Sequence, residues 1–158
     1  MNIKTIEWKN NKIKIIDQSK LPLKLEYIYI DNLSRLFHAI RSLEIRGAPA
    51  LGAAAGLGVY LGIKNSKANN FSGFSKELDR VAKYIASSRP TARNLFWAIE
   101  RMCSIAIRNK DKPVPVIKRL IFAEAQKIIE EDRVACRKIG YFGTKLITKN
   151  DAVLTICN

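Results

Sequence analysis

The segment from Ala48 to Ile63 consists almost entirely of glycine, alanine and aliphatic residues. Pro49 suits the first turn of a helix, where its missing N–H removes no hydrogen bond. In the helix that we predict here, small residues occupy nearly every face, so neighbouring elements can approach its backbone closely on several sides. The pattern therefore favours a helix packed inside a bundle. Since the apolar run is shorter than a membrane span, no transmembrane helix is predicted.

Periodicity predicts the elements on either side of this helix. Residues 1–30 alternate between apolar and polar in the manner of strands, with Asn10-Asn11 as a turn, which indicates a small antiparallel sheet. Apolar residues then recur at helical spacing. We expect helices over 33–43, from Ser75 to 85, from Thr91 to 106 and over 116–148, with Lys64 to Gly73 as a loop.

The segment from Asp151 to Asn158 is a short apolar run after a charged turn, which is typical of a strand buried on both faces of a parallel sheet. Such a strand needs hydrogen-bonding partners that this sequence does not supply, so we expect an interrupted sequence. We predict an α+β fold: an N-terminal domain over 1–148, with a sheet over 1–30 and a helical bundle over 31–148. Residues 149–158 would then form the first strand of an incomplete, Rossmann-like C-terminal α/β domain.

The composition narrows the function. The net charge of +14 could indicate nucleic acid, a membrane surface or an anionic substrate, but the lysines are scattered rather than clustered, which favours a solvated basic surface. The three cysteines lie far apart with no CxxC pair, which argues against a disulfide framework and a zinc site. His38 is the single histidine, so a catalytic triad is not expected. The N-terminus lacks the features of a secretory signal, which predicts a cytoplasmic protein.

Two arginines stand at junctions that lead into predicted helices. Arg46 precedes Gly47-Ala48-Pro49, and Arg89 precedes Pro90-Thr91. The free N–H groups and the dipole of a helix N-terminus attract an anion, so these junctions could converge on one phosphate. Plain helix connections with exposed arginines remain the alternative. Cys157 ends the predicted strand, where its thiol could act as a base or nucleophile, although the strand position taken alone favours a buried structural cysteine.

Four strings then stand out in order and spacing: IRGAPALGAAAGLG at 45–58, RPTARNLFWAIERM at 89–102, EAQKIIEEDRVACRKIG at 124–140 and LTICN at 154–158. Together with the early tryptophan strand and the stretch from Asp17-Gln18 to Leu21-Pro22, they resemble methylthioribose-1-phosphate isomerases over essentially the whole chain. The wider superfamily includes ribose-1,5-bisphosphate isomerase and regulatory subunits of the translation-initiation nucleotide exchange factor.

The resemblance implies conversion of a cyclic aldose 1-phosphate into the open ketose 1-phosphate, in methionine salvage, without a metal or organic cofactor. It implies that Arg46, Gly47, Ala48 and Arg89 bind the substrate with Asn158, and that Cys157 is the catalytic cysteine.

The family's catalytic aspartate lies in a C-terminal domain, so we expect a chain that is inactive alone. Its partners would be the sugar phosphate and either a separate C-terminal half or a second copy in a homodimer. The alternatives are a regulatory exchange-factor relative, a ribose-1,5-bisphosphate isomerase relative and a basic nucleic-acid-binding protein.

Overall fold

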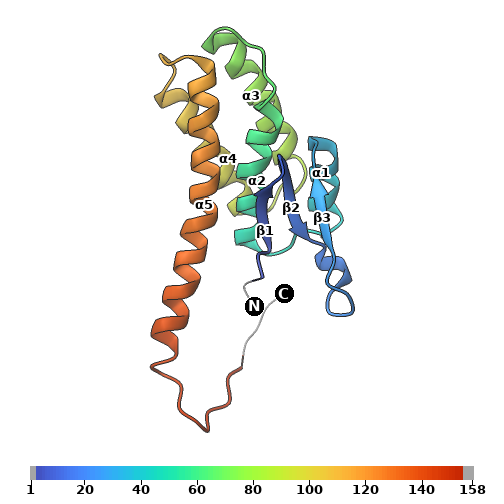
Figure 1. The fold of residues 1–158 in the computed structure, drawn as a ribbon, viewed down its shortest axis with the longest axis vertical. Helices are drawn as coiled ribbons and strands as arrows, with labels where there is room; N and C mark the ends of the chain where they lie inside the picture. Colours follow the sequence, from blue (N-terminus) through green and yellow to red (C-terminus); the bar gives the residue numbers. More distant parts are fainter. Residues whose placement is uncertain (1–2, 155–158) are drawn as a thin grey trace.

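A computed structural model describes residues 3–154 as a three-stranded sheet packed against a bundle of five helices (Figure 1), which confirms the predicted α+β class. The elements are β1 (Ile6–Lys9), β2 (Lys12–Ile16), the 3-10 helix η1 (Gln18–Lys20), β3 (Tyr27–Ile30), α1 (Leu33–Arg41), α2 (Ala48–Ile63), α3 (Phe71–Ala86), α4 (Arg93–Arg108) and α5 (Val114–Gly143). Within the described range, no helix is long and apolar enough to cross a bilayer.

The N-terminal sheet is antiparallel, with strand order β1-β2-β3. Trp8 pairs with Ile13 across the first hairpin, and Asn10 and Asn11 both adopt positive φ at its turn. Asparagine tolerates this left-handed conformation better than most residues, which explains the predicted turn. Ile13 and Ile15 of β2 are almost fully buried, so one face of the sheet contributes to the common core.

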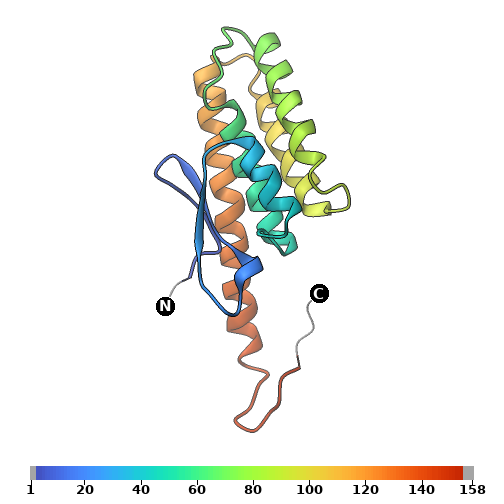
Figure 2. The same ribbon diagram turned by 90° about the vertical axis from the view of Figure 1, so that its right-hand side faces the viewer.

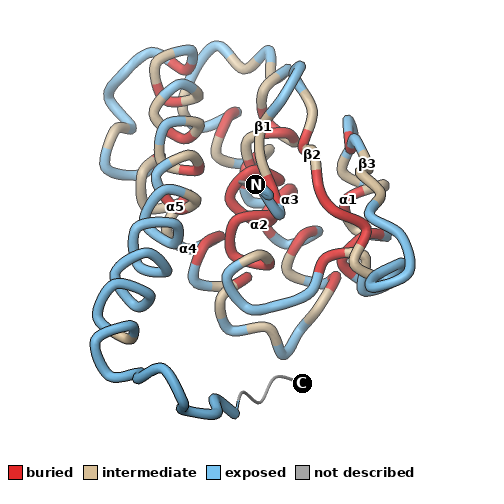
Figure 3. Tube along the Cα trace, turned by 60° about the horizontal axis from the view of Figure 1, so that its bottom comes forward, coloured by how far each residue is buried: buried red, intermediate tan, exposed pale blue. Residues whose placement is uncertain are grey.

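Helix α2 lies at the centre of the bundle, and eleven of its sixteen residues are buried. The sheet and the other four helices surround it, as the buried colouring of Figure 3 shows. Gly56 faces Ala125 and Ile128 of α5, and Gly62 faces Val81 of α3. The predicted helix packed on several sides is confirmed.

The helices alternate in direction along the bundle. In Figures 1 and 2, α2 and α4 run one way while α3 and α5 run the other, so α2 and α4 begin at the same end. The close approach of Gly52 to Asn94 agrees with this arrangement. Helix α5 continues past the bundle at that end, and its residues 130–142 are exposed. We call this stretch the overhang.

Several predicted helix boundaries are wrong. Helix α3 begins at Phe71 rather than Ser75, because the side chain of Asn70 accepts a hydrogen bond from the Gly73 N–H at 2.9 Å and caps the helix. Helix α4 begins at Arg93 rather than Thr91, with Ala92 as its N-cap. The last helix spans Val114–Gly143 instead of 116–148.

The predicted strand at the end of the chain is not tested here. Residues 151–154 are described and lie outside any strand or helix, while residues 155–158 lie outside the described residues. An opening strand of a C-terminal α/β domain therefore stays a prediction.

The close packing of α2 can be tested by adding one methyl group. A Cβ at Gly62 would lie 2.6 Å and 2.8 Å from the two Cγ atoms of Val81 and 2.9 Å from Cδ1 of Leu33. Since a β-branched side chain has few alternative rotamers, Gly62→Ala should lower the free energy of unfolding by about 1–3 kcal/mol, measured by urea denaturation.

Gly140→Ala in α5 is the matched control, because nothing lies within 4 Å of its added Cβ. There the higher helix propensity of alanine should leave stability unchanged or raise it by up to about 1 kcal/mol. Equal effects of the two substitutions would contradict close packing at Gly62.

Candidate functional site

Two helices enter the bundle at one end without a side-chain cap. Gly47 is the N-cap of α2 and Ala92 is the N-cap of α4, and neither has a side chain that can accept a hydrogen bond from the first turn. By contrast, Asn32 and Asn70 cap α1 and α3. The first N–H groups of α2 and α4 are therefore available to an external acceptor, and an anion is the preferred one.

The turn before α2 has a backbone conformation that favours glycine. Gly47 has φ 87° and ψ 137°, a region that residues with a Cβ rarely adopt. Its neighbour Arg46 is exposed and forms no salt bridge with any carboxylate among residues 3–154. An arginine without a partner thus stands beside an uncapped helix N-terminus.

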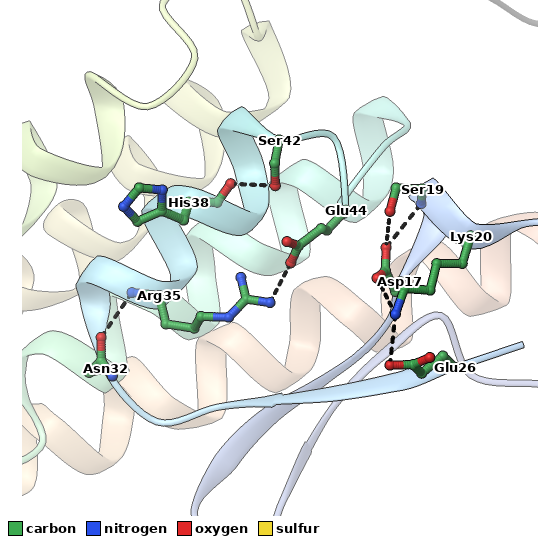
Figure 4. Close-up of polar contacts among 9 residues, drawn as sticks. All are labelled: Asp17, Ser19, Lys20, Glu26, Asn32, Arg35, His38, Ser42 and Glu44. Carbon is green, nitrogen blue, oxygen red and sulfur yellow. Dashed lines mark hydrogen bonds and ion pairs between the residues drawn. The ribbon is translucent and has the colours of Figure 1, made fainter.

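Long-range contacts hold this turn in place. The side-chain amide of Gln18 donates a hydrogen bond to the Arg46 carbonyl at 3.2 Å, and its backbone N–H donates to the Glu44 carbonyl at 3.1 Å. Glu44 in turn accepts a hydrogen bond from the Arg35 guanidinium at 2.6 Å (Figure 4). The 3-10 segment and α1 therefore fix the turn from two sides.

Gln18 is itself positioned by a buried carboxylate. Asp17 accepts hydrogen bonds from the N–H of Ser19 at 3.0 Å and from its hydroxyl at 2.6 Å, as Figure 4 shows. Only 4% of Asp17 is exposed. Because a buried carboxylate is stable only when it is hydrogen-bonded, these contacts fix the 3-10 helix that carries Gln18.

A hollow of about 270 Å³ opens at the turn, and we call it the Arg46 hollow. Its polar side chains come from three parts of the chain: Thr5 just before β1, Gln18 and Arg46 of the 3-10 helix and the turn, and Asp132 of α5. Its lining consists of Thr5, Ile6, Gln18, Arg46, Gly47, Pro49, Ala50, Ala53, Ile129 and Asp132.

A second hollow of about 260 Å³ adjoins it between α2, α4 and α5, and we call it the Trp97 hollow. Its lining consists of Pro49, Gly52, Asn94, Trp97, Ile128, Glu131, Asp132 and Ala135. Pro49 and Asp132 line both hollows, so they are neighbouring parts of one surface at the entrances of the two helices.

The sequence-predicted site residues are brought together to different degrees. Arg46 and Gly47 line the Arg46 hollow, and Ala48 is exposed at the start of α2. Arg89 is half-buried in the turn before α4, where its carbonyl accepts a hydrogen bond from Ala92 at 3.1 Å, and it lines neither hollow. The two helix entrances do adjoin, whereas convergence of both guanidiniums on one anion stays a prediction.

Cys157 and Asn158, predicted as the catalytic cysteine and its neighbour, lie outside the described residues. Of the other thiols, that of Cys103 is partly buried, and burial together with Asp79 and Glu100 raises its pKa, which makes it a poor nucleophile. Cys136 is exposed on α5. Within residues 3–154, no group of three or more histidine, cysteine or acidic side chains could hold a metal ion.

Sequence reasoning did not assign a role to Gln18, Asn94, Trp97 and Asp132. All four belong to strings that carried the family resemblance, but no local pattern indicates that Gln18 shares the Arg46 hollow with Asp132, or that Asn94 and Trp97 share the Trp97 hollow with it. A hollow formed by residues from four separate elements is a product of tertiary structure, which periodicity does not encode.

One arginine fixes the wall between α4 and α5. Arg101 of α4 donates hydrogen bonds to Glu124 at 2.5 Å and to the two carboxylate oxygens of Glu131 at 2.6 and 3.0 Å. Its guanidinium lies 5.3 Å from the Trp97 ring. The hydrogen bond from Arg101 lowers the pKa of Glu131. We call this group the Arg101 clamp, and it holds two residues that line the Trp97 hollow.

Arg101→Met should weaken the contact between α4 and α5. Losing charged, bidentate hydrogen bonds should lower the free energy of unfolding by roughly 1–3 kcal/mol near pH 7. The hydrogen bond that lowers the pKa of the carboxylate stabilises the fold at pH values above the ordinary pKa. This stabilisation is lost as the pH falls through the lowered pKa. The wild type should therefore lose this stabilisation progressively as the pH falls below 4.5, the ordinary pKa of a glutamate, and the variant should lack it.

The measurement is urea unfolding at several pH values. Arg133→Met is the matched control, because Arg133 pairs with Glu130 within one turn of the same exposed helix and joins no second element. Its stability should not change measurably. Equal losses in the two variants would contradict a role for the Arg101 clamp between helices.

Gly47→Ala tests the turn before α2. No atom lies within 4 Å of an added Cβ, so any loss of stability must come from the positive φ. We expect a decrease of about 1–3 kcal/mol in the free energy of unfolding, measured by thermal or urea denaturation. An unchanged stability would mean that the turn relaxes to another conformation.

Comparison with known proteins gives two kinds of match. The family model described as "Initiation factor 2 subunit family" matches residues 44–158. A methylthioribose-1-phosphate isomerase of Geotalea daltonii is 46% identical over 158 residues, which are 100% of this chain and 46% of that relative's length. The chain thus spans about half the length of the curated relative that it matches.

Solved structures agree with this match. A 5-methylthioribose 1-phosphate isomerase from Pyrococcus horikoshii OT3 superposes with a TM-score of 0.88 at 35% identity, covering 92% of this chain and 41% of the other. A structure described as translation initiation factor eIF-2B, subunit delta, from A. fulgidus superposes with a TM-score of 0.87 at 40% identity, covering 99% and 45% respectively.

Proposed function

Since this chain belongs to the initiation factor 2 subunit family, we propose that it serves in methylthioribose-1-phosphate isomerisation as a substrate-binding part that is inactive alone, and that the helix entrances at Arg46 and Arg89 bind the substrate's phosphate. The observation that carries the proposal is the Arg46 hollow, in which an arginine that pairs with no carboxylate of residues 3–154 stands beside the uncapped N-terminus of α2. Similarity to named isomerases over the whole chain supports the choice of substrate.

The phosphate would be held by charge and by backbone donors together. The guanidinium of Arg46 offers a planar pair of N–H donors that match phosphate oxygens. Further attraction comes from the α2 dipole and from the free N–H groups of Ala48 and Ala50. Pro49 between them has no N–H and donates nothing. Arg89 would approach the same anion from the turn before α4.

The reaction requires acid–base help because the phosphate on C1 prevents simple ring opening. A pocket that excludes water strengthens such help. We propose that Cys157 supplies a catalytic thiol and that Asn158 contacts the substrate, on the resemblance of the terminal LTICN string to the family. No metal or organic cofactor enters this proposal.

The proposed partners are the substrate and further protein. Ile139, Tyr141 and Phe142 expose apolar or aromatic side chains on the overhang. Since exposed apolar groups of this size usually mark a contact, we propose that another polypeptide packs here, either a separate C-terminal half or a second copy of the chain.

Titration of the 158-residue chain with methylthioribose 1-phosphate tests the proposal. Isothermal calorimetry should give a measurable Kd, and Arg46→Met and Arg89→Met should each weaken binding about 10-fold or more, because each removes a charged hydrogen bond. Arg108→Met is the control, since Arg108 is exposed at the opposite end of α4 and should have no effect. Binding that Arg46→Met leaves unchanged would refute the assignment of the phosphate site.

A second candidate is a regulatory subunit of a translation-initiation exchange factor. The likeness to the A. fulgidus structure favours it, because that match covers 99% of this chain at 40% identity. The same titration separates the two candidates. A chain with no affinity for sugar phosphates but with RNA binding that falls steeply with salt would support the second candidate, since counterion release governs such binding.

A further inference from the structure

Asp132 on the overhang lies where three hollows meet. It lines the Arg46 hollow, the Trp97 hollow and a larger third hollow of about 880 Å³ between β1 and α5. The third hollow is lined from residue 3 to Trp8 on the sheet side and from Gln126 to Arg137 on α5. Asp132 therefore brings a carboxylate from α5 to a hollow whose arginine comes from the α2 turn.

The carboxylates next to Asp132 already have partners. Glu131 accepts hydrogen bonds from Arg101 and lies 3.8 Å from Lys127, and Glu130 pairs with Arg133. Asp132 forms no salt bridge among residues 3–154, and its recorded contact is the Cys136 thiol at 4.0 Å. Apart from this weak contact to Oδ1, the carboxylate can accept hydrogen bonds in a hollow that Arg46 also lines.

The lining of the Arg46 hollow carries groups of both charges. Arg46 and the N-terminus of α2 contribute positive charge, and Asp132 of α5 contributes a carboxylate. The apolar side chains of Ile6, Ala53 and Ile129 lie among them. A ligand that fits needs an anionic group at one end and hydrogen-bond donors at the other.

A pentose 1-phosphate has this distribution of groups. Its phosphate would repel a carboxylate, but its ring hydroxyls are donors, and an ionised carboxylate is an acceptor with two oxygens. A carboxylate that accepts two neighbouring hydroxyls gives stronger, charge-assisted hydrogen bonds than a neutral side chain would.

We propose that Asp132 accepts hydrogen bonds from the ribose hydroxyls while Arg46 holds the phosphate, so that Asp132 selects a sugar phosphate over phosphate alone. The inference rests on the proposed function and adds a residue that determines specificity. It also predicts an asymmetry between ligands: removing the carboxylate should weaken binding of the sugar phosphate and leave the anion site intact.

Calorimetric titration of the full 158-residue chain with inorganic phosphate and with methylthioribose 1-phosphate tests this asymmetry. In Asp132→Asn, the Kd for methylthioribose 1-phosphate should rise about 10-fold, while the Kd for phosphate should stay equal or fall about 2-fold because a repulsive charge is gone. For 2-deoxyribose 1-phosphate, which lacks one hydroxyl, the increase in Kd should be smaller. The control is Glu130→Gln, two residues before Asp132 on the same helix. Because Glu130 is paired with Arg133, this substitution should change none of these values.

The outcomes distinguish failure of the proposed function from failure of the role given to Asp132. A wild-type chain that binds neither phosphate nor methylthioribose 1-phosphate would overturn the proposed function and this inference with it. A chain that binds both ligands, but in which Asp132→Asn affects them equally or not at all, would overturn the role of Asp132 alone. Asp132 is exposed on a helix, so its amide variant should fold, and circular dichroism provides the check.

Discussion

Contact of neighbouring helices with the bare backbone of α2 is the constraint on which the rest of this structure depends. At Gly62 the Val81 side chain of α3 occupies space that a Cβ would need, and at Gly56 a Cβ would lie 3.3 Å from Ile128 of α5. Because interiors are packed as densely as organic crystals, a larger residue at such a position forces neighbouring side chains and backbone to shift. The same closeness sets where α4 lies, since Gly52 adjoins Asn94. The position of both helix entrances therefore follows from the small residues of α2.

The candidate site combines groups whose charges are complementary to a bipolar ligand. On one side, α2 begins without a side-chain cap beside Arg46, whereas asparagines cap α1 and α3. Without a side-chain cap, the first N–H groups of a helix normally bind water. Here the first turn of α2 lines the Arg46 hollow, so a ligand in that hollow can accept their hydrogen bonds. On the other side, α5 supplies Asp132. The site therefore depends on the pairing of α2 with α5, and neither helix alone would create it.

Much of the fold was predictable from the sequence because it is encoded locally. The antiparallel sheet, the turn at Asn10-Asn11 and the α2 helix follow from alternation, turn chemistry and small-residue content. The starts of α3 and α4 were predicted wrongly, since Ser75 and Thr91 resemble caps while Asn70 and Ala92 hold those positions.

For the site, the sequence indicated Arg46 and Gly47, whose neighbours along the chain reveal a helix entrance. It did not indicate Gln18 or Asp132, because these residues reach the entrance only through the packing of distant elements.

The Arg101 clamp has a mechanical consequence. It binds Glu124 and Glu131, which lie two turns apart on α5, so it holds that helix at one point inside the bundle and at one point where the exposed stretch begins. The overhang is therefore fixed to α4 at Glu131, near its first residue, while the rest of it is exposed. A protein that pushed on the free end would transmit the displacement to Asp132 and Ala135, and so change the width of the adjoining hollows at a distance from the point of contact.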